Sequence, residues 1–177
     1  SNNSAQTGAG IRCSESPLTV VIDGCTITSN TATATGGGIS CSGANLAMTN
    51  CIVTGNTATQ SGGGIWLATT VAAMTNCVVA GNTSNAGGGI YCSSSSPAVN
   101  NCTIANNTAN IGGGIYFDTG TATLSNTIMW SNGAANGKQI YLAQGDIALN
   151  SCNFANNAGD IVNAGAGTVT LNGNCKM

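Results

Sequence analysis

The 177-residue chain is almost uncharged, with three Lys or Arg, five Asp or Glu, no His and a formal net charge of −2. Charged residues make up 5% of it, so we expect no basic surface that could bind nucleic acid. No stretch is apolar over the length of a transmembrane helix, and we expect no membrane insertion. The length suits a single domain, residues 1–177.

A unit of 25 or 26 residues repeats along most of the chain. Its best copy is residues 87–111, GGGIYCSSSSPAVNNCTIANNTANI, and residues 36–61, 62–86 and 112–136 begin with the same GGGI. Self-similarity at this period is typical of solenoids, and a unit so rich in Gly, Thr and Asn does not suit helical hairpins.

The units divide the chain into coils. Residues 1–7 are polar and are expected to form an N-terminal arm or loop, and residues 8–35 form the first coil. Four regular coils follow at residues 36–61, 62–86, 87–111 and 112–136. Residues 137–159 form a sixth coil, and residues 160–177 a truncated last one.

Within the best copy the apolar residues alternate over three short runs, residues 90–92, 97–99 and 102–104, which is strand periodicity. Stacking the units in register turns each inward position into an apolar column. The three columns are Ile11, Ile39, Ile65, Ile90, Ile115 and Ile140; Ile22, Met48, Met74, Val99, Leu124, Leu149 and Leu171; and Ile27, Val53, Val79, Ile104, Met129 and Phe154. The sequence therefore predicts an all-β, single-domain, right-handed parallel β-helix of about seven coils with three short strands each.

Two asparagine columns accompany the apolar ones. The first is Asn50, Asn76, Asn101 and Asn126, and the second is Asn30, Asn56, Asn82, Asn107, Asn132 and Asn157. We interpret both as turn residues whose amides can bond from coil to coil, because Asn tolerates left-handed backbone. The triple glycines are interpreted as corners that need positive φ and close backbone approach, since no helix or Lys follows them to make a phosphate site.

Nine cysteines indicate an oxidising compartment, and an odd number leaves at least one without a partner within the chain. Five share a column, Cys25, Cys51, Cys77, Cys102 and Cys152, and three share another, Cys13, Cys41 and Cys92. Replacement by Leu67, Phe117 and Leu142 in the second column favours buried thiols as apolar fillers. Bonds within a coil, Cys13–Cys25, Cys41–Cys51 and Cys92–Cys102, stay open as the alternative. Without CxxC or His no zinc site is expected, and no cofactor.

The GGGI signal and an apolar-x-x-Asn tetrad eighteen residues on resemble the GGA[ILV] and FxxN repeats of polymorphic outer membrane proteins. They resemble still more the right-handed β-helix repeat proteins of bacterial surfaces. The best tetrad is Phe154-Ala155-Asn156-Asn157, and elsewhere Ile, Val or Met replaces Phe. The resemblance implies an extracellular or cell-surface location and an adhesive or structural role.

Pectate lyases and polygalacturonases also look like this fold, so catalysis must be weighed. Those activities need clustered carboxylates in a groove, and the acids here are scattered. They are Glu15, Asp23, Asp118, Asp146 and Asp160. Only Asp118 and Asp146 are expected in turns of adjacent coils, and we predict that the protein is not an enzyme.

The outer face of the first strand carries the most distinctive candidate site. Its column reads Arg12, Ser40, Trp66, Tyr91, Tyr116, Tyr141 and Val162. Four aromatic side chains in a row could stack on the sugar rings of a glycan or pack against another protein, with simple self-stacking as the alternative.

These patterns favour a non-enzymatic extracellular structural protein that stacks end to end with further copies of itself into a fibre or surface layer. The candidate assembly ends are Ile11, Ile22 and Ile27 on one side and Ile161, Val169 and Leu171 on the other. A carbohydrate-binding adhesin that uses the aromatic column is the alternative. Ice binding is a minor alternative, since abundant Thr favours it but the outward pairs of the third strand form no flat Thr array.

Overall fold

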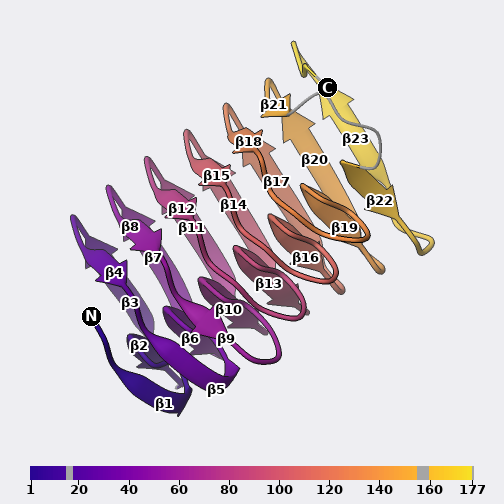
Figure 1. Cartoon of the computed structure of the whole chain (residues 1–177). Coiled ribbons are helices and arrows are strands. Elements are labelled where there is room, and N and C mark those ends of the chain that lie inside the picture. The colour runs from indigo at the N-terminus through magenta and orange to yellow at the C-terminus, as the bar shows by residue number, and fades with distance from the viewer. Residues whose placement is uncertain (15–17, 155–159, 177) are drawn as a thin grey trace.

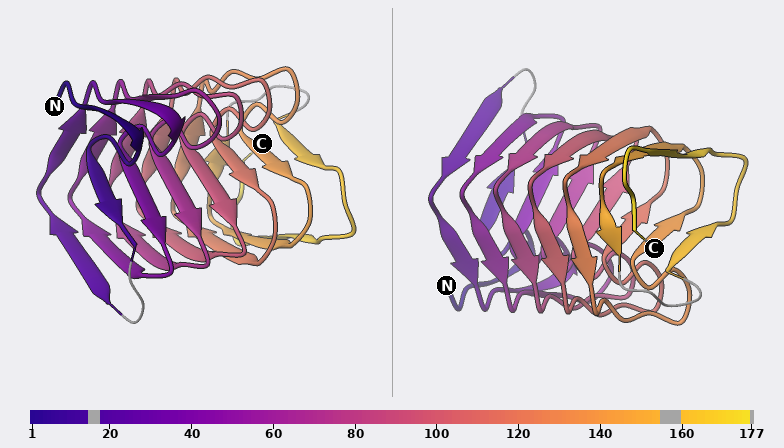
Figure 2. Two further views of the ribbon diagram at one scale, coloured as in Figure 1. Left: turned by 90° about the horizontal axis from the view of Figure 1, so that it is seen from below. Right: turned by 90° about the horizontal axis from the view of Figure 1, so that it is seen from above.

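In the computed structural model, which describes residues 1–14, 18–154 and 160–176, the chain winds into a right-handed parallel β-solenoid of about six turns. Every regular element of the described residues is a strand, and every strand pair is parallel (Figure 1). The two ends of the chain lie at opposite ends of the stack (Figure 2). The predicted fold class is confirmed, and the number of turns is close to the seven expected.

Three long sheets form the main walls. The first sheet consists of β2 (Ile11–Cys13), β6 (Ile39–Ser42), β10 (Ile65–Ala68), β13 (Ile90–Ser93), β16 (Ile115–Phe117), β19 (Ile140–Leu142) and β22 (Ile161–Asn163). The second consists of β3 (Thr19–Asp23), β7 (Asn45–Thr49), β11 (Val71–Thr75), β14 (Ser96–Asn100), β17 (Thr121–Ser125), β20 (Asp146–Asn150) and β23 (Val169–Asn172). The third consists of β4 (Thr26–Thr28), β8 (Ile52–Thr54), β12 (Val78–Ala80), β15 (Thr103–Ala105), β18 (Ile128–Trp130) and β21 (Asn153–Phe154).

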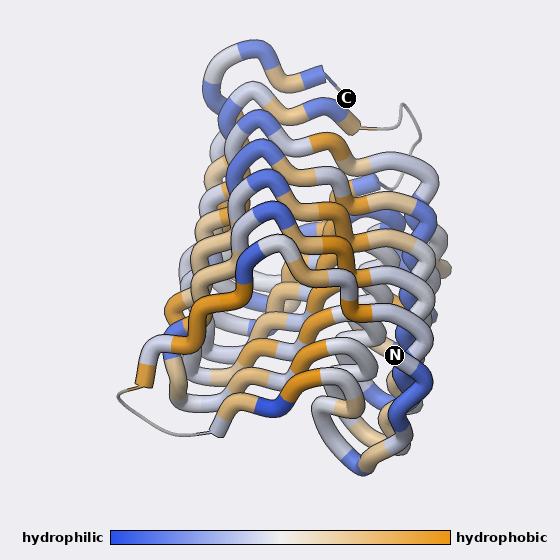
Figure 3. Tube along the Cα trace, turned by 90° about the vertical axis from the view of Figure 1, so that its left-hand side faces the viewer, coloured by the Kyte–Doolittle hydropathy of each residue, from blue (hydrophilic) through white to orange (hydrophobic). Residues whose placement is uncertain are grey.

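The register of these sheets places each coil directly above the one before. Ile65 pairs with Ile39 and Ile90, Met74 with Met48 and Val99, and Val79 with Val53 and Ile104. All three predicted apolar columns are therefore confirmed. Figure 3 shows hydrophobic residues at the same place in successive coils, and the inward side chains from Ile39 to Leu149 are almost all fully buried. The core is one continuous cluster along the axis.

A fourth, shorter sheet closes the coil where only a turn was expected. It contains β1 (Ser4–Thr7), β5 (Thr31–Thr35) and β9 (Thr57–Ala58), and isolated parallel bridges such as Thr83↔Thr108 continue it. Ala32 and Ala58 are its inward residues and are buried with Ala9. The expectation that residues 1–7 form an arm or loop is wrong, because residues 4–7 pair in parallel with β5.

The triple glycines form the corner between the fourth and first sheets, and they contact the second asparagine column, which lies at the corner between the third and fourth sheets. The first glycine has positive φ, 65° at Gly62, and a Cβ at Gly63 would lie 2.4 Å from the Thr83 carbonyl oxygen. A Cβ at Gly64 would lie 2.9 Å from the Asn82 amide nitrogen. The third glycine therefore leaves room for the asparagine of its own coil, which explains why the two signals recur together.

The asparagines of the second column, between the third and fourth sheets, are buried and bond to one another. Asn82 accepts hydrogen bonds at Oδ1 from the Asn56 backbone N–H (2.9 Å) and side-chain amide (3.1 Å), and its own amide donates to the Val53 carbonyl (3.0 Å). Asn30, Asn107 and Asn132 are buried in the same ladder, and Asn157 lies outside the described residues. The first column, Asn50, Asn76, Asn101 and Asn126, has positive φ of 50–55° at the bend between the second and third sheets.

Candidate functional site

The predicted aromatic column is present on the outer face of the first sheet. Trp66 pairs in register with Tyr91, Tyr91 with Tyr116, and Tyr116 with Tyr141, and all four side chains are half-buried. The Tyr91 and Tyr116 rings stack with centroids 4.9 Å apart and planes within 6°, and Tyr116 and Tyr141 follow at 5.3 Å and 15°. The column is thus an ordered aromatic surface held by the strand spacing.

The hydroxyls of Tyr91 and Tyr116 stay protonated well into the alkaline range. Burial, and then the neighbouring Asp118 carboxylate, raise the pKa of Tyr91 to about 12. Burial and Asp118 also raise the pKa of Tyr116. These hydroxyls can therefore donate as well as accept hydrogen bonds at neutral pH.

A recess of ≈ 210 Å³ adjoins the tryptophan end of the column. It is lined by Thr7, Arg12, Cys13, Ser14, Thr35, Ser40, Ser42 and Trp66. Arg12, Ser40 and Trp66 follow one another on β2, β6 and β10, so the small Ser40 leaves a gap between two longer side chains. The sequence placed these three residues in one column. The small Ser40 between the longer Arg12 and Trp66 was the sequence signal for a recess, which was not predicted.

The carboxylates do not form a cluster in the described part of the chain. Asp118 accepts a hydrogen bond from Ser93 (3.2 Å), whereas Asp146 pairs in register with Thr121 and accepts from the Thr168 backbone N–H (2.8 Å). The Thr168 bonds lower the pKa of Asp146. Asp146 also lines a recess with Gln144, Gly145, Gly165, Ala166 and Gly167. Asp23 is exposed, Asp160 is buried, and Glu15 lies outside the described residues.

The described residues contain no group of three or more His, Cys, Asp or Glu arranged to hold a metal ion. Nor does any helix among them have the length and apolar character to cross a membrane.

The two predicted assembly ends differ in exposure. At the first coil Ile22 and Ile27 are buried and Ile11 is half-buried, because their side chains point to the axis and the second coil covers them. At the last coil Ile161 and Val169 are half-buried and Leu171 is 46% exposed. The edge strands of the three long sheets are β2, β3 and β4 at one end and β22, β23 and β21 at the other.

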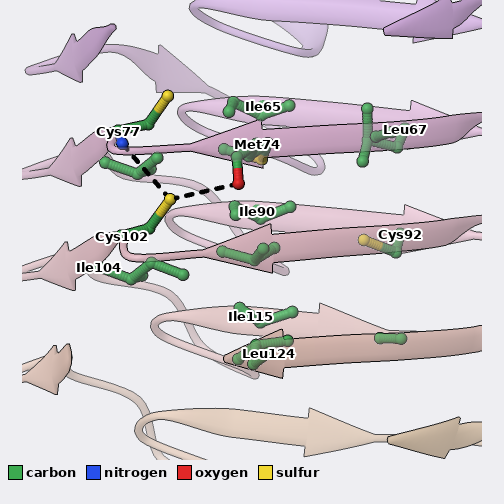
Figure 4. Close-up of a cluster of buried hydrophobic side chains, with 14 of the residues drawn as sticks. Ile65, Leu67, Met74, Cys77, Ile90, Cys92, Cys102, Ile104, Ile115 and Leu124 are labelled. Atoms are coloured by element: carbon green, nitrogen blue, oxygen red, sulfur yellow. Dashed lines mark hydrogen bonds between the residues drawn. The ribbon is translucent and has the colours of Figure 1, made fainter. Parts of the chain in front are cut away.

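All nine cysteines are thiols in the structure. The within-coil alternative is not supported, because the cysteines that interact lie in neighbouring coils of one column. The Cys77 backbone N–H donates to Cys102 Sγ (3.4 Å), as Figure 4 shows, and Cys13 interacts with Cys41. Seven of the nine are buried; Cys25 is exposed and Cys175 is half-buried.

The fold is a right-handed parallel β-solenoid built from stacked repeats. Residues 38–176 match the family described as a right handed beta helix region, and the chain belongs to that family. Residues 24–42 also match the Chlamydia polymorphic membrane protein repeat. This segment holds Ile27, Asn30 and the triple glycine before Ile39, so the resemblance of the sequence is confirmed. The last three residues of the predicted best tetrad, 155–157, lie outside the described residues. No curated protein and no solved structure matches the chain significantly.

Proposed function

We propose that the protein is a non-enzymatic structural component of a bacterial-type cell surface, and that its copies stack end to end. The match to a polymorphic membrane protein repeat supports the surface location. The observation that carries the stacking is the geometry of the two ends, where the first and second sheets terminate in parallel edge strands, while Lys176 pairs with Asn153 beside β21 of the third sheet. Such edges expose backbone groups that can pair with a further strand.

The joint would continue the inner columns without a break. With β22 of one copy beside β2 of the next, Ile11 of the next copy follows Ile161 in the first-sheet column. With β23 beside β3, Leu171 meets Ile22 and loses the exposure it has in the single chain. Because the two ends differ, the contact is heterologous and does not close, so it yields a filament.

Electron microscopy of the purified chain at high concentration tests this proposal. We expect rods with an axial repeat close to the length of one subunit, roughly 30 Å for six to seven coils. Leu171→Asp places a charge in the joint and should shift sedimentation towards the monomer. A wild-type chain that sediments as a monomer at all concentrations would contradict the proposal.

The matched control for this variant is Val71→Asp. Val71 is 63% exposed and faces outward from β11 in the middle of the stack. The same new charge therefore lies outside the contact between two copies. Its sedimentation should equal that of the wild type. Loss of assembly in both variants would mean that added charge alone, and not the end of the solenoid, decides the result.

The aromatic column supports a second function, the binding of a glycan by an adhesin. Sugar rings present flat apolar faces, and four half-buried aromatic side chains on successive strands offer a matching row. The recess beside Trp66 adds hydroxyl groups and the Arg12 guanidinium at one end of this row.

A glycan array followed by tryptophan fluorescence tests glycan binding. Trp66→Ala should weaken binding of any hit about fivefold, since an aromatic contact contributes about 1 kcal/mol. Trp130→Ala is the control, because Trp130 is 54% exposed but stands on the third sheet. An array without hits, or an equal loss in both variants, would leave self-stacking as the role of the column.

Ice binding stays a prediction. The outward third-sheet positions are mixed, with Thr26, Ile52, Val78, Thr103 and Ile128 in one column. The fourth sheet, which was not expected, carries an exposed column of Thr31, Thr57, Thr83 and Thr108. Thermal hysteresis that disappears on replacement of Thr57 and Thr83 would support it.

A further inference from the structure

Six of the nine cysteines occupy one position of the coil, the corner between the second and third sheets. The side chain at this corner donates to a second-sheet carbonyl of the previous coil: Cys51 to Ile22 (3.3 Å), Cys102 to Met74 (3.7 Å), Thr127 to Val99 (3.4 Å), Cys152 to Leu124 (3.4 Å) and Cys175 to Leu149 (3.3 Å). Cys175 therefore continues the corner column, although the spacing of the last coil hides this in the sequence. Thr127 divides the column into a run of four cysteines, at coils one to four, and a run of two.

The remaining three cysteines occupy the inner column of the first sheet. Cys13 pairs in register with Cys41, and Cys41 with Leu67. Cys92 stands between Leu67 and Phe117, so it has no cysteine neighbour in its column. Counted along the axis, the uninterrupted runs contain four, two, two and one cysteines. Every run holds an even number of cysteines, which can pair completely, except the run that consists of Cys92 alone.

We propose that in an oxidising compartment these runs form four disulfides between neighbouring coils and leave Cys92 as a thiol. The bonds are Cys13–Cys41, Cys25–Cys51, Cys77–Cys102 and Cys152–Cys175. Neighbouring strands lie about 4.8 Å apart, within the Cα separation of about 4.4–6.8 Å that a disulfide spans. In the run of four only this pairing uses every thiol, because a Cys51–Cys77 bond would isolate Cys25 and Cys102.

The Cys77–Cys102 pair shows how one bond would form. The Cys77 backbone N–H donates to Cys102 Sγ (3.4 Å), and the two sulfurs point to the same side of their coils in Figure 4. The hydrogen bond between the two side chains lowers the pKa of Cys77 and raises that of Cys102. Cys77 is therefore the thiol that reaches the thiolate form first.

The oxidant is a small disulfide such as oxidised glutathione, or the disulfide of a thiol oxidase. The Cys77 thiolate attacks one sulfur of the oxidant, so a mixed disulfide forms and one thiolate leaves. The Cys102 thiolate then attacks the Cys77 sulfur, and the second oxidant thiolate leaves. The protein loses two protons and two electrons, and the oxidant disulfide becomes two thiols.

Burial orders these bonds by access. Cys25 is exposed and Cys175 half-buried, whereas both members of the Cys13–Cys41 and Cys77–Cys102 pairs are buried. An oxidant therefore reaches Cys25–Cys51 and Cys152–Cys175 more readily than the two buried pairs. In the folded protein a reductant should open Cys25–Cys51 and Cys152–Cys175 first.

Peptide mapping of the chain refolded in a glutathione redox buffer tests the proposal. After alkylation in denaturant without reductant, we expect one alkylated cysteine, Cys92, and four cross-linked peptide pairs that join neighbouring coils. The oxidised chain should be lighter than the reduced one by eight hydrogens, two for each bond. Nine alkylated thiols, a Cys41–Cys51 link within one coil, or a Cys51–Cys77 link would each overturn it.

Single variants make the assignment independent of the overall yield. Cys102→Thr copies the residue that the chain itself carries at Thr127, so the fold should accept it. It should free Cys77 for alkylation and leave the other three bonds intact. Cys92→Ala is the control and should leave all four. Release of a second pair in either variant would overturn the assignment, which does not depend on end-to-end stacking.

Discussion

Buried asparagine side chains hydrogen-bond to backbone groups of the neighbouring coils at one corner of this solenoid. Asn82 accepts from the Asn56 backbone N–H and side chain, and donates to the Val53 carbonyl. Each of these groups is buried, so water cannot replace a lost partner. The asparagine ladder is therefore structural, and its polar groups stabilise the fold only as a complete set.

Replacement of one member should consequently affect its neighbours. Asn82→Ala leaves the buried Asn56 N–H without its acceptor and removes the bond to the Val53 carbonyl, and we expect the free energy of unfolding to fall by at least about 2 kcal/mol. Chemical denaturation followed by circular dichroism measures this change. Asn76→Gly is the control, because Asn76 is exposed with φ 54° and glycine adopts that conformation freely. A change below about 0.5 kcal/mol is expected for it, and an equal loss in both would contradict the ladder's role.

At the scale of the element, the corner glycines set how closely one coil follows the next. Gly63 does not have positive φ, so its requirement is for space alone, with a Cβ 2.4 Å from the Thr83 carbonyl oxygen and 2.6 Å from that of Gly88. Both neighbours are backbone atoms that cannot turn away. A methyl group there would push two coils apart.

We therefore expect Gly63→Ala to lower the free energy of unfolding by about 1–3 kcal/mol, the usual cost of overpacking. Gly133→Ala is the matched control, since its Cβ would meet nothing closer than 3.9 Å and its φ is not positive either. That variant should be neutral or slightly stabilising. Denaturant midpoints of the two proteins decide the matter, and similar midpoints would show that the corner can relax.

The strands themselves show what could be predicted from the sequence. Ile90, Met74 and Val79 stand in columns whose members are all large and apolar, so repeat spacing alone placed them correctly. The fourth sheet was missed because its inward residues, Ala32 and Ala58, are small and its strands are short. The alternation of Thr and Ala in residues 31–35 was the available signal.

The candidate site was predictable in its register but not in its shape. The column from Arg12 to Tyr141 followed from the repeat, whereas the recess beside Trp66 depends on how Ser40 and the fourth sheet meet. The exposure of the ends was also missed, because Ile22 and Ile27 point to the axis and pack beneath Met48 and Val53. Cys175 could not be placed, since the last coil is shorter than the repeat.

At the scale of the whole molecule, the stack behaves as a one-dimensional array in which a coil contacts only its two neighbours. Removal of residues 112–136 would join Ile111 to Gly137 and bring Ile90 beside Ile140, Val99 beside Leu149, and Ile104 beside Phe154. We expect this shortened chain to keep its strand signal in circular dichroism and to unfold cooperatively. Removal of residues 112–130 instead leaves residues 131–136 as an extra segment between the coils that must stack, and it should weaken the strand signal and the cooperativity more than removal of the whole repeat.

In-register stacking therefore also constrains how the gene for such a chain can change. An in-frame duplication or loss of one whole repeat preserves every column. At each new boundary Ile again stacks on Ile, Asn bonds to Asn, and Gly packs on Gly. A shorter insertion within a strand misaligns all inward residues that follow it in that coil. Length variants that differ by complete repeats are thus the form of variation that this architecture tolerates best.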